Sequence, residues 1–268
     1  MTPLLQVTHL TRRFGGYTAL ADVSCDVAAG TIHALIGPNG AGKTTLFNIV
    51  SGVLRPTTGT LVYEGRDYTG TRADQVFAMG VARNFQQVRL FKGLSIVENV
   101  MIGCHARMGG LVRDLANLAL PKPATEIAAR RRALEMLELV GMGSRTTGLP
   151  QELTLVDQRR LEIARALAST PKLLLLDEPA AGMNPTEVRE LAELVRRIVA
   201  LGITVLLVEH HMRFVMAIAD TITVLSAGRI IAQGPPEVIQ KDEGVPSLLF
   251  AKSWRLAWGL AELRASTG

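Results

Sequence analysis

Residues 37–45, which read GPNGAGKTT, constrain this chain more than any other stretch. They fit the pattern G-x-x-x-x-G-K-[ST] of a phosphate-holding loop, the P-loop. Its glycines let backbone N–H groups converge on an anion without a Cβ clash. The pattern predicts that Lys43 reaches the β- and γ-phosphates of a nucleotide and that the Thr44 hydroxyl binds Mg²⁺. The expected phosphate-binding residues are Gly37, Pro38, Asn39, Gly40, Ala41, Gly42, Lys43, Thr44 and Thr45.

The residues on either side of the loop agree with this interpretation. Residues 31–36 are a short apolar run typical of a buried strand, and residues 44–51 have the pattern of a helix. The N-terminus of that helix would point at the phosphates and add its dipole. A glycine-rich turn that matches the pattern by chance is the alternative. The strand before the loop and the helix after it favour a site for a nucleoside triphosphate.

Composition bounds the class of protein. The chain has 268 residues, 48% of them hydrophobic and 20% charged, which fits one α/β domain or one with an inserted subdomain. No apolar run approaches the roughly 18 residues that span a bilayer, and no signal-peptide pattern precedes the first strand. The two cysteines, Cys25 and Cys104, lie far apart and match no metal or redox spacing. We therefore expect a reduced, cytosolic protein.

The net charge of +5 is spread over short basic clusters. A nucleic-acid surface would fit this charge, although aromatic residues make up only 4% of the chain. Contact with anionic lipid headgroups would fit equally well. The charge alone does not choose between these partners.

The order of the predicted elements indicates the fold class. Residues 4–10 and 19–28 have strand patterns on either side of Gly15 and Gly16, and strands are also expected at 59–65 and 81–85, with a helix at 71–79 between them. Residues 95–168 have mostly helical patterns. Strands and helices then alternate again, with strands at 173–176, 203–208, 221–225 and 229–233 and helices at 187–200 and 212–219. This order predicts an α/β fold: a P-loop NTPase core with a mostly parallel sheet, an antiparallel β part near the N-terminus and an inserted helical subdomain.

The same pattern suggests domain boundaries. Residues 1–240 would form one nucleotide-binding domain, with a core at about 1–86 and 171–240 and the helical subdomain at about 87–170. Residues 241–268 would form a helical tail. Within the helical part, we expect Ile127, Ala133, Leu134, Leu137 and Val140 to form one apolar helix face, leaving residues 130–132, three arginines, in solvent.

Residues 173–179, LLLLDEP, are an apolar strand that ends in two carboxylates. In a P-loop enzyme an aspartate at a strand end holds Mg²⁺, which predicts that role for Asp177. The next residue, Glu178, is then placed to polarise an attacking water as a general base. Two acidic residues at a strand end are often only a solvated edge. Together with an upstream P-loop they favour a catalytic pair.

With these motifs the sequence resembles the ATP-binding subunits of ABC transporters over roughly residues 4–240. The resemblance implies that Phe14 stacks on adenine, that Gln86 contacts Mg²⁺ and the membrane subunits, and that His210 is a switch residue that senses the γ-phosphate. Residues 180–184 take the place of the D-loop. Each residue has a plainer interpretation when taken alone: Phe14 as core, Gln86 as a surface amide, and His210 with His211 as loop histidines or metal ligands. No zinc-site spacing lies nearby, so ATP and Mg²⁺ are the expected cofactors.

Three stretches narrow the resemblance: residues 83–91 (RNFQQVRLF), 159–165 (RRLEIAR) and 176–185 (LDEPAAGMNP). They are similar to the ATP-binding protein of branched-chain amino-acid importers. The resemblance implies a peripheral ATPase on the cytoplasmic face of the membrane. Its implied partners are a second ATP-binding subunit, often non-identical, two membrane permeases and a solute-binding protein.

Two rival functions stay open at this point. One is the ATPase of a lipid- or lipopolysaccharide-extracting exporter. The other is a soluble ABC ATPase that acts on DNA or ribosomes. That second rival is weakened because such proteins usually carry long coiled coils or two fused P-loop domains. We therefore expect no nucleic-acid partner.

The chain departs from the family pattern in two places. The family signature LSGGQ is replaced at residues 153–157 by LTLVD, so both glycines are absent. Thr154 keeps a hydroxyl that could contact ATP bound to the partner subunit, in trans, and with Asp157 it also forms a capping box for the next helix. The second departure is the apolar tail after about residue 241, for which packing on the core is the plain interpretation and a membrane-surface or partner contact the alternative.

Overall fold

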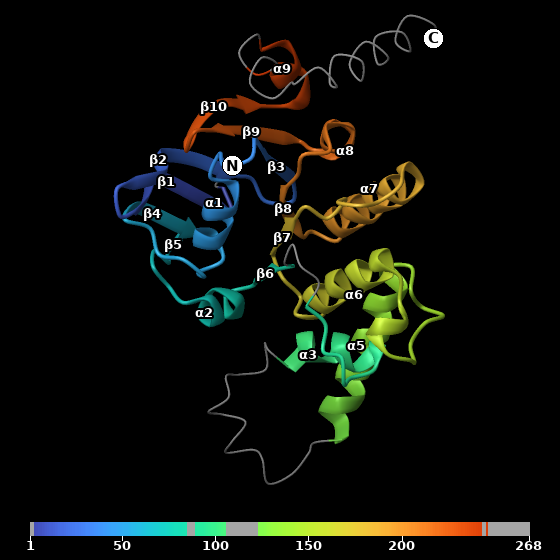
Figure 1. Cartoon of the computed structure of the whole chain (residues 1–268). Coiled ribbons are helices and arrows are strands. Elements are labelled where there is room, and N and C mark those ends of the chain that lie inside the picture. The colour runs from blue at the N-terminus through green and yellow to red at the C-terminus, as the bar shows by residue number, and fades with distance from the viewer. Residues whose placement is uncertain (1–2, 85–88, 106–122, 243–244, 246–268) are drawn as a thin grey trace, which may run out of the picture.

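The computed structural model describes residues 3–84, 89–105, 123–242 and 245 (Figure 1). The expectations for Gln86 and for the apolar tail fall outside these residues. The described chain is built around two β-sheets and a group of helices.

The smaller sheet is antiparallel and comes from the N-terminal part of the chain. Its strand order is β2-β1-β4-β5. The strands are β1 (Leu5–Phe14), β2 (Tyr17–Val27), β4 (Thr58–Tyr63) and the two-residue β5 (Arg66–Asp67). The first two pair as a hairpin, with Phe14 opposite Tyr17 at the turn. The predicted antiparallel part is confirmed, and β5 extends it beyond the prediction.

The larger sheet has six strands in the order β10-β9-β3-β8-β7-β6. All neighbours are parallel except β10, which is antiparallel to β9. The strands are β3 (Ile32–Ile36), β6 (Val81–Arg83), β7 (Leu173–Asp177), β8 (Thr204–Val208), β9 (Thr221–Ser226) and β10 (Arg229–Gly234). Because parallel strands place their carboxyl ends at one edge, the loops after β3, β7 and β8 meet there, beside the end of β6.

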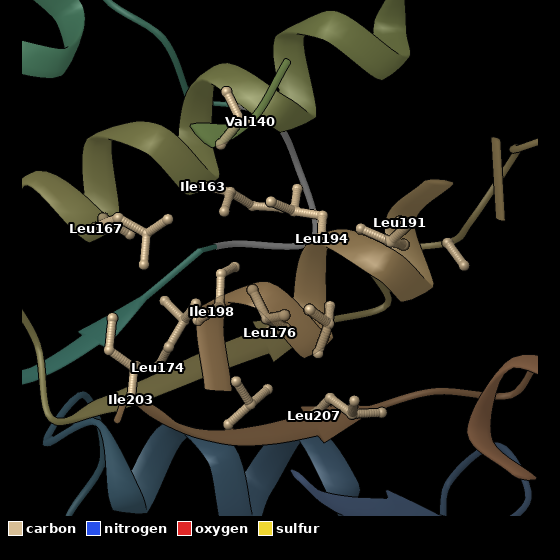
Figure 2. Packing of buried hydrophobic residues seen from close by; sticks show 14 of the residues in the cluster. Val140, Ile163, Leu167, Leu174, Leu176, Leu191, Leu194, Ile198, Ile203 and Leu207 are labelled. Carbon is tan, nitrogen blue, oxygen red and sulfur yellow. The ribbon is translucent and has the colours of Figure 1, made fainter. Parts of the chain in front are cut away.

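The two faces of the larger sheet belong to separate cores. Leu173 and Leu175 point into a core shared with α1 (Lys43–Val50) and the smaller sheet. Leu174 and Leu176 point the other way, toward α7 (Pro185–Ala200) and α8 (Met212–Ile218). Figure 2 shows Leu174 and Leu176 packed with Leu194 and Ile198 of α7. This alternation follows from the period of two in a strand and explains why β7 is apolar throughout.

The remaining helices complete the fold. They are α2 (Ala73–Ala78), α3 (Ile96–His105), α5 (Pro123–Leu139), the 3-10 turn η1 (Pro150–Glu152), α6 (Leu155–Ala168) and α9 (Pro236–Lys241). Figure 1 shows α3, α5 and α6 grouped together, away from the smaller sheet. A Cβ on Gly103 of α3 would lie 2.0 Å from the carbonyl oxygen of Arg165, so only glycine allows the close approach of α3 and α6.

The predicted buried face of α5 is partly wrong. Ala133, Leu137 and Val140 are buried, but Ile127 is 69% exposed and Leu134 is 37% exposed. Their places in the core are taken by Ala129 and Met136. Residues 129, 133, 136, 137 and 140 form one stripe at helical spacing, whereas Ile127 and Leu134 lie seven residues apart on another. The prediction that residues 130–132 lie in solvent holds for Arg130 and Arg131, which are exposed, but Arg132 is half-buried.

Candidate nucleotide-binding site

The loop between β3 and α1 has a backbone that requires glycine at two positions. Gly37 has φ 152°, and a Cβ there would lie 2.0 Å from the carbonyl oxygen of Leu225. Gly42 has φ 103°, and its Cβ would lie 2.6 Å from the carbonyl oxygen of Ala19. Both glycines therefore let the loop pack against β9 and β2 in a conformation that L side chains rarely adopt. Gly42 is the N-cap of α1, so the first turn of that helix opens toward the loop.

Lys43 is buried beneath the loop. Its ammonium donates hydrogen bonds to the carbonyl oxygens of Gly37 at 2.7 Å and Pro38 at 3.0 Å. Burial lowers the pKa of Lys43, and the negative charges of Glu178 and Asp177 oppose this shift. A cation held inside a loop of backbone N–H groups gives the site the positive potential that phosphates need.

Asp177 lies at the carboxyl end of β7 and is buried. Its backbone N–H donates to the side-chain oxygen of Asn84 at 3.0 Å. Its carboxylate forms an ion pair with Arg83 of β6, 2.8 Å from Nη2 to Oδ2. Arg83 also donates to Asn48 Oδ1 at 2.7 Å and Ser51 Oγ at 2.9 Å, at and just beyond the end of α1. Arg83 thus ties the predicted metal-binding carboxylate to the helix that follows the P-loop.

Glu178 follows Asp177 with φ 48°, a left-handed conformation that costs a non-glycine residue about 1–2 kcal/mol. Two interactions hold its backbone. Its N–H donates to the carbonyl oxygen of Val208 at 2.9 Å. Arg159 of α6 donates to the carbonyl oxygens of Glu178 at 3.0 Å and Pro179 at 2.9 Å. Strained residues held by their surroundings are typical of functional sites, which supports the selection of Glu178.

His210 lies beside Glu178, with its Nδ1 3.8 Å from Glu178 Oε1. Its side chain is 60% exposed, so it is open to a ligand. The preceding residue, Glu209, is fully buried, and its carboxylate accepts backbone N–H groups from both Ala180 and His210. The loop after β8 is therefore joined to the loop after β7.

A cavity of about 840 Å³ connects these groups. It is large enough for a nucleotide, since ligand pockets span roughly 300–1,000 Å³. It is lined by the loop residues together with Phe14, Tyr17, Ala19, Ile36, Glu178, Glu209, His210 and Met212. Phe14 is 45% exposed and Tyr17 61%, so both aromatic side chains beside the cavity are accessible to solvent. The guanidinium carbon of Arg12 lies 4.5 Å from the centre of the Phe14 ring.

The segment that replaces LSGGQ forms the start of α6. Thr154 is the N-cap, and its hydroxyl oxygen accepts the backbone N–H of Asp157 at 3.2 Å, so the Thr154 half of the predicted capping box is present. The Asp157 carboxylate accepts the Thr154 hydroxyl at 3.0 Å and pairs with Arg145 at 2.6 Å. Arg160 lies 3.9 Å from the other carboxylate oxygen. Two arginines therefore offset the charge of Asp157.

The structure brings most of the predicted residues to one cavity. The loop from Gly37 to Thr45, Phe14, Glu178 and His210 line it, and Asp177 lies beside Glu178 in the chain. Thr154 does not line it, and its action on the partner's ATP stays a prediction. Gln86 lies at 85–88, outside the described residues.

Sequence reasoning missed Tyr17, Arg83, Arg159 and Glu209. Tyr17 had a signal, because it is an aromatic residue at the same hairpin turn as Phe14. The other three act through contacts between segments distant in sequence, and only the folded chain reveals them.

Two absences hold for the described part of the chain. It contains no group of three or more histidine, cysteine or acidic residues that could hold a metal ion unaided. Within the same residues, no helix is both long and apolar enough to cross a bilayer.

Comparison with known proteins gives consistent matches. The pattern of the family described as ABC transporter matches residues 20–181. The chain is 42% identical over 248 residues to the high-affinity branched-chain amino acid transport ATP-binding protein LivG of Salmonella typhimurium, covering 91% of this chain and 96% of that protein. It is 32% identical to the lipopolysaccharide export system ATP-binding protein LptB of Haemophilus influenzae, covering 94% and 99%. An ATP-binding cassette of an ABC transporter, solved in its ADP conformation, superposes with a TM-score of 0.81 at 29% identity, covering 92% of this chain and 98% of that one.

Proposed function

The chain belongs to the ABC transporter family, and on that premise we propose that it is the ATP-hydrolysing subunit of an importer for branched-chain amino acids or similar small solutes. It is an ATPase, as the family match and its relatives establish. The observation that carries the choice of importer is the 42% identity to LivG over nearly the whole of both chains. LptB, which belongs to an export system, is similar over as much of the chain but only 32% identical.

Uptake separates the importer from the exporter. The chain would be co-expressed with candidate permeases and a candidate solute-binding protein from the same organism, in a host that lacks its own branched-chain importers. We expect ATP-dependent uptake of labelled leucine, isoleucine or valine, abolished by Lys43→Ala. No uptake, together with lipopolysaccharide release that depends on Lys43, would support the exporter instead.

Binding of ATP is assigned to the P-loop and its neighbours. Lys43 would move from the carbonyl oxygens of its own loop, 2.7 and 3.0 Å away, to the phosphates. The N–H groups at the start of α1 would donate to the phosphates, with the helix dipole in the favourable sense. The exposed ring of Phe14 at the cavity mouth suits stacking on the base, and Tyr17 adds a second aromatic face there.

The residues present also fit Mg²⁺, which usually binds through one or two carboxylates plus substrate phosphates rather than an all-protein cage. Asp177 supplies a buried carboxylate, and Thr44 an exposed hydroxyl at the start of α1. Gln86 is proposed as a third contact from the resemblance alone. When bound, the ion would neutralise charge on the phosphates.

Hydrolysis is assigned to Glu178 and His210. Glu178 is partly exposed, at 23%, and lines the cavity, so its carboxylate can orient a water and accept its proton. His210, which is open to the cavity and close to that carboxylate, would donate a hydrogen bond to the γ-phosphate. We propose that this residue pair makes turnover depend on the presence of the third phosphate.

We propose that this chain works as one of a pair of cassettes bound to permeases, on the cytoplasmic face of the membrane, as its family resemblance implies. The described residues contain no helix that could cross the bilayer, so attachment would come from the permeases. We expect the chain to sediment with membranes when its permeases are co-expressed. Tight membrane binding by the chain alone would contradict this and would direct attention to residues 246–268.

We further propose that the second ATP-binding subunit is non-identical and that the two ATP sites are unequal. The argument begins with Val156, the second residue of α6, which is half-buried and replaces a signature glycine. A β-branched side chain there crowds the approach of a partner's γ-phosphate to the helix N-terminus. The arginines beside Asp157 offset its charge, so the obstacle is steric more than electrostatic. Thr154 keeps the hydroxyl that could still contact that phosphate.

This chain's own P-loop and Glu178 would serve one active site, completed by a normal signature from the partner. The site completed by residues 153–157 should turn over ATP more slowly, by on the order of 10²-fold for a misplaced phosphate donor. Single-turnover hydrolysis in the assembled transporter tests this, with the catalytic glutamate changed to glutamine in one subunit at a time. Val156→Gly should speed the slower site. Equal losses from the two glutamine variants, or a fully active homodimer of this chain, would contradict the proposal.

A further inference from the structure

Glu209 is a fully buried glutamate whose carboxylate holds two loops of the nucleotide site in place. It follows β8 directly and precedes His210. Its Oε1 accepts the backbone N–H of Ala180 at 2.8 Å. Its Oε2 accepts the backbone N–H of His210 at 2.9 Å and of His211 at 3.0 Å. One carboxylate thus joins the segment after Glu178 to the segment that carries His210.

This carboxylate is not available for catalysis. Glu209 borders the cavity, but its side chain is 0% exposed and both of its oxygens accept backbone N–H groups, so it cannot meet a water as Glu178 can. Burying a carboxylate is costly unless its oxygens are satisfied by donors, and hydrogen bonds to a charged acceptor are the stronger kind. The three N–H groups offset that cost. Because this carboxylate is fixed in place, it restricts the backbone positions of Ala180, His210 and His211.

The constraint bears on His210. The imidazole Nδ1 lies 3.8 Å from Glu178 Oε1 and 4.0 Å from Glu209 Oε2, so both carboxylate oxygens are beyond hydrogen-bond distance. Its side chain is 60% exposed. The position of the ring therefore depends on where the backbone of His210 is held, and Glu209 holds that backbone. The same carboxylate also binds the backbone N–H of Ala180, two residues after Glu178, and so fixes the backbone of His210 relative to the segment that carries Glu178.

We propose that Glu209 is a positioning residue for ATP hydrolysis, which sets His210 relative to Glu178 by bracing the two loops together. This inference rests on the role proposed above for His210. A purely structural role, in which Glu209 only stabilises the end of β8, makes a different prediction. In that case its removal would weaken folding and affect turnover regardless of whether a histidine is present at position 210.

Glu209→Gln is the direct test because it keeps the size of the side chain. An amide has one acceptor oxygen and a donor NH₂ group, so it cannot accept all three N–H groups. The NH₂ group then faces either the backbone N–H of Ala180 or those of His210 and His211, so the hydrogen bonds to one of the two loops are lost. The matched control is Asp220→Asn. Asp220 also accepts a backbone N–H, from Ile32 at 2.7 Å, but at the start of β3, the opposite end of the sheet from the P-loop.

The experiment is a double-mutant cycle in the assembled transporter, with the partner subunit's own ATP site inactivated. Glu209→Gln, His210→Ala and the double variant are compared for kcat and for KM of ATP, and thermal unfolding of each free chain is recorded. We expect Glu209→Gln alone to lower kcat about 10-fold or more, since small misplacements are costly, with little change in KM. In the His210→Ala background it should lower kcat less than about 2-fold further, because coupled residues are not additive. Its effect on the unfolding temperature should be the same in both backgrounds, and Asp220→Asn should leave kcat unchanged.

The outcomes separate the two claims. Equal fold-losses in both backgrounds, or an unchanged kcat in Glu209→Gln, would overturn the positioning role while leaving His210 in its proposed place. An unchanged kcat in His210→Ala would refute the role of His210 itself, and this inference with it. If Glu209→Gln does not fold, Glu209→Asp takes its place under the same criteria. It keeps the charge but is one methylene too short to reach both loops.

Discussion

The ion pair of Arg83 with Asp177 lets one stability prediction be worked out from the structure. The two side chains are 8% and 5% exposed and lie 2.8 Å apart. Arg83 also donates to Asn48 and Ser51, and its guanidinium lies 5.6 Å from the centre of the Phe47 ring. Arg83→Met keeps the length of the side chain but removes its charge and donors. Removing one partner of a buried pair leaves the other charge uncompensated, so we expect the free energy of unfolding to fall by about 3–5 kcal/mol.

The assay is urea unfolding of the free chain followed by far-ultraviolet circular dichroism. The matched control is Arg72→Met, because Arg72 pairs with Asp74 at 3.1 Å with side chains 73% and 66% exposed. That exposed pair should contribute no more than about 1 kcal/mol. Adding Asp177→Asn to Arg83→Met should recover part of the loss, because no charge then remains buried alone. A loss in Arg83→Met no larger than in Arg72→Met, or simple additivity with Asp177→Asn, would refute this reasoning.

Two further predictions concern single residues. Lys43→Ala should weaken ATP binding about 10-fold or more, because it removes a charged donor to the phosphates. Lys172→Ala, on the exposed surface, should leave ATP binding unchanged. Titration with a fluorescent ATP analogue measures both affinities, and equal affinities in the two variants would count against the site. Burial lowers the pKa of His33 to about 4, so between that value and its unfolded pKa near 6.5 the unfolded chain binds the extra proton. The free energy of unfolding should therefore fall as pH is lowered through this range, by about 2 kcal/mol at pH 5 from this residue. His33→Gln should remove that part of the pH dependence. An identical pH dependence in the variant would refute this prediction.

The parts of the fold that follow from local pattern could be predicted. Residues 37–45 require a strand before them and a helix after them, and β3 and α1 are both present. The uninterrupted apolar runs at β7 and β8 indicated strands covered on both faces, which the two cores confirm. In each case the physical cause lies within a few residues of the pattern.

The parts that depend on which segments meet could not be predicted. Ile127 and Leu134 have helical spacing, but α3 and α6 pack on a different stripe of α5, the one that begins at Ala129. Arg83 and Asp177 are 94 residues apart, and the carboxylate of Glu209 reaches Ala180 across 29 residues. From sequence alone, a charged residue at a strand end is predicted to be exposed to solvent, because the residues that pack against it are not known. The positioning contacts of the site were therefore hidden, whereas its phosphate-binding loop was not.

We propose that ATP is hydrolysed in this cavity and that Glu178 activates the attacking water. Glu178→Gln is the most direct measurement, because it removes the basic oxygen and leaves the shape of the site intact. In the assembled transporter, ATP affinity should stay close to that of the unaltered chain, and turnover at this site should fall about 10²-fold or more. Undiminished ATP hydrolysis by the Glu178→Gln variant would contradict the account.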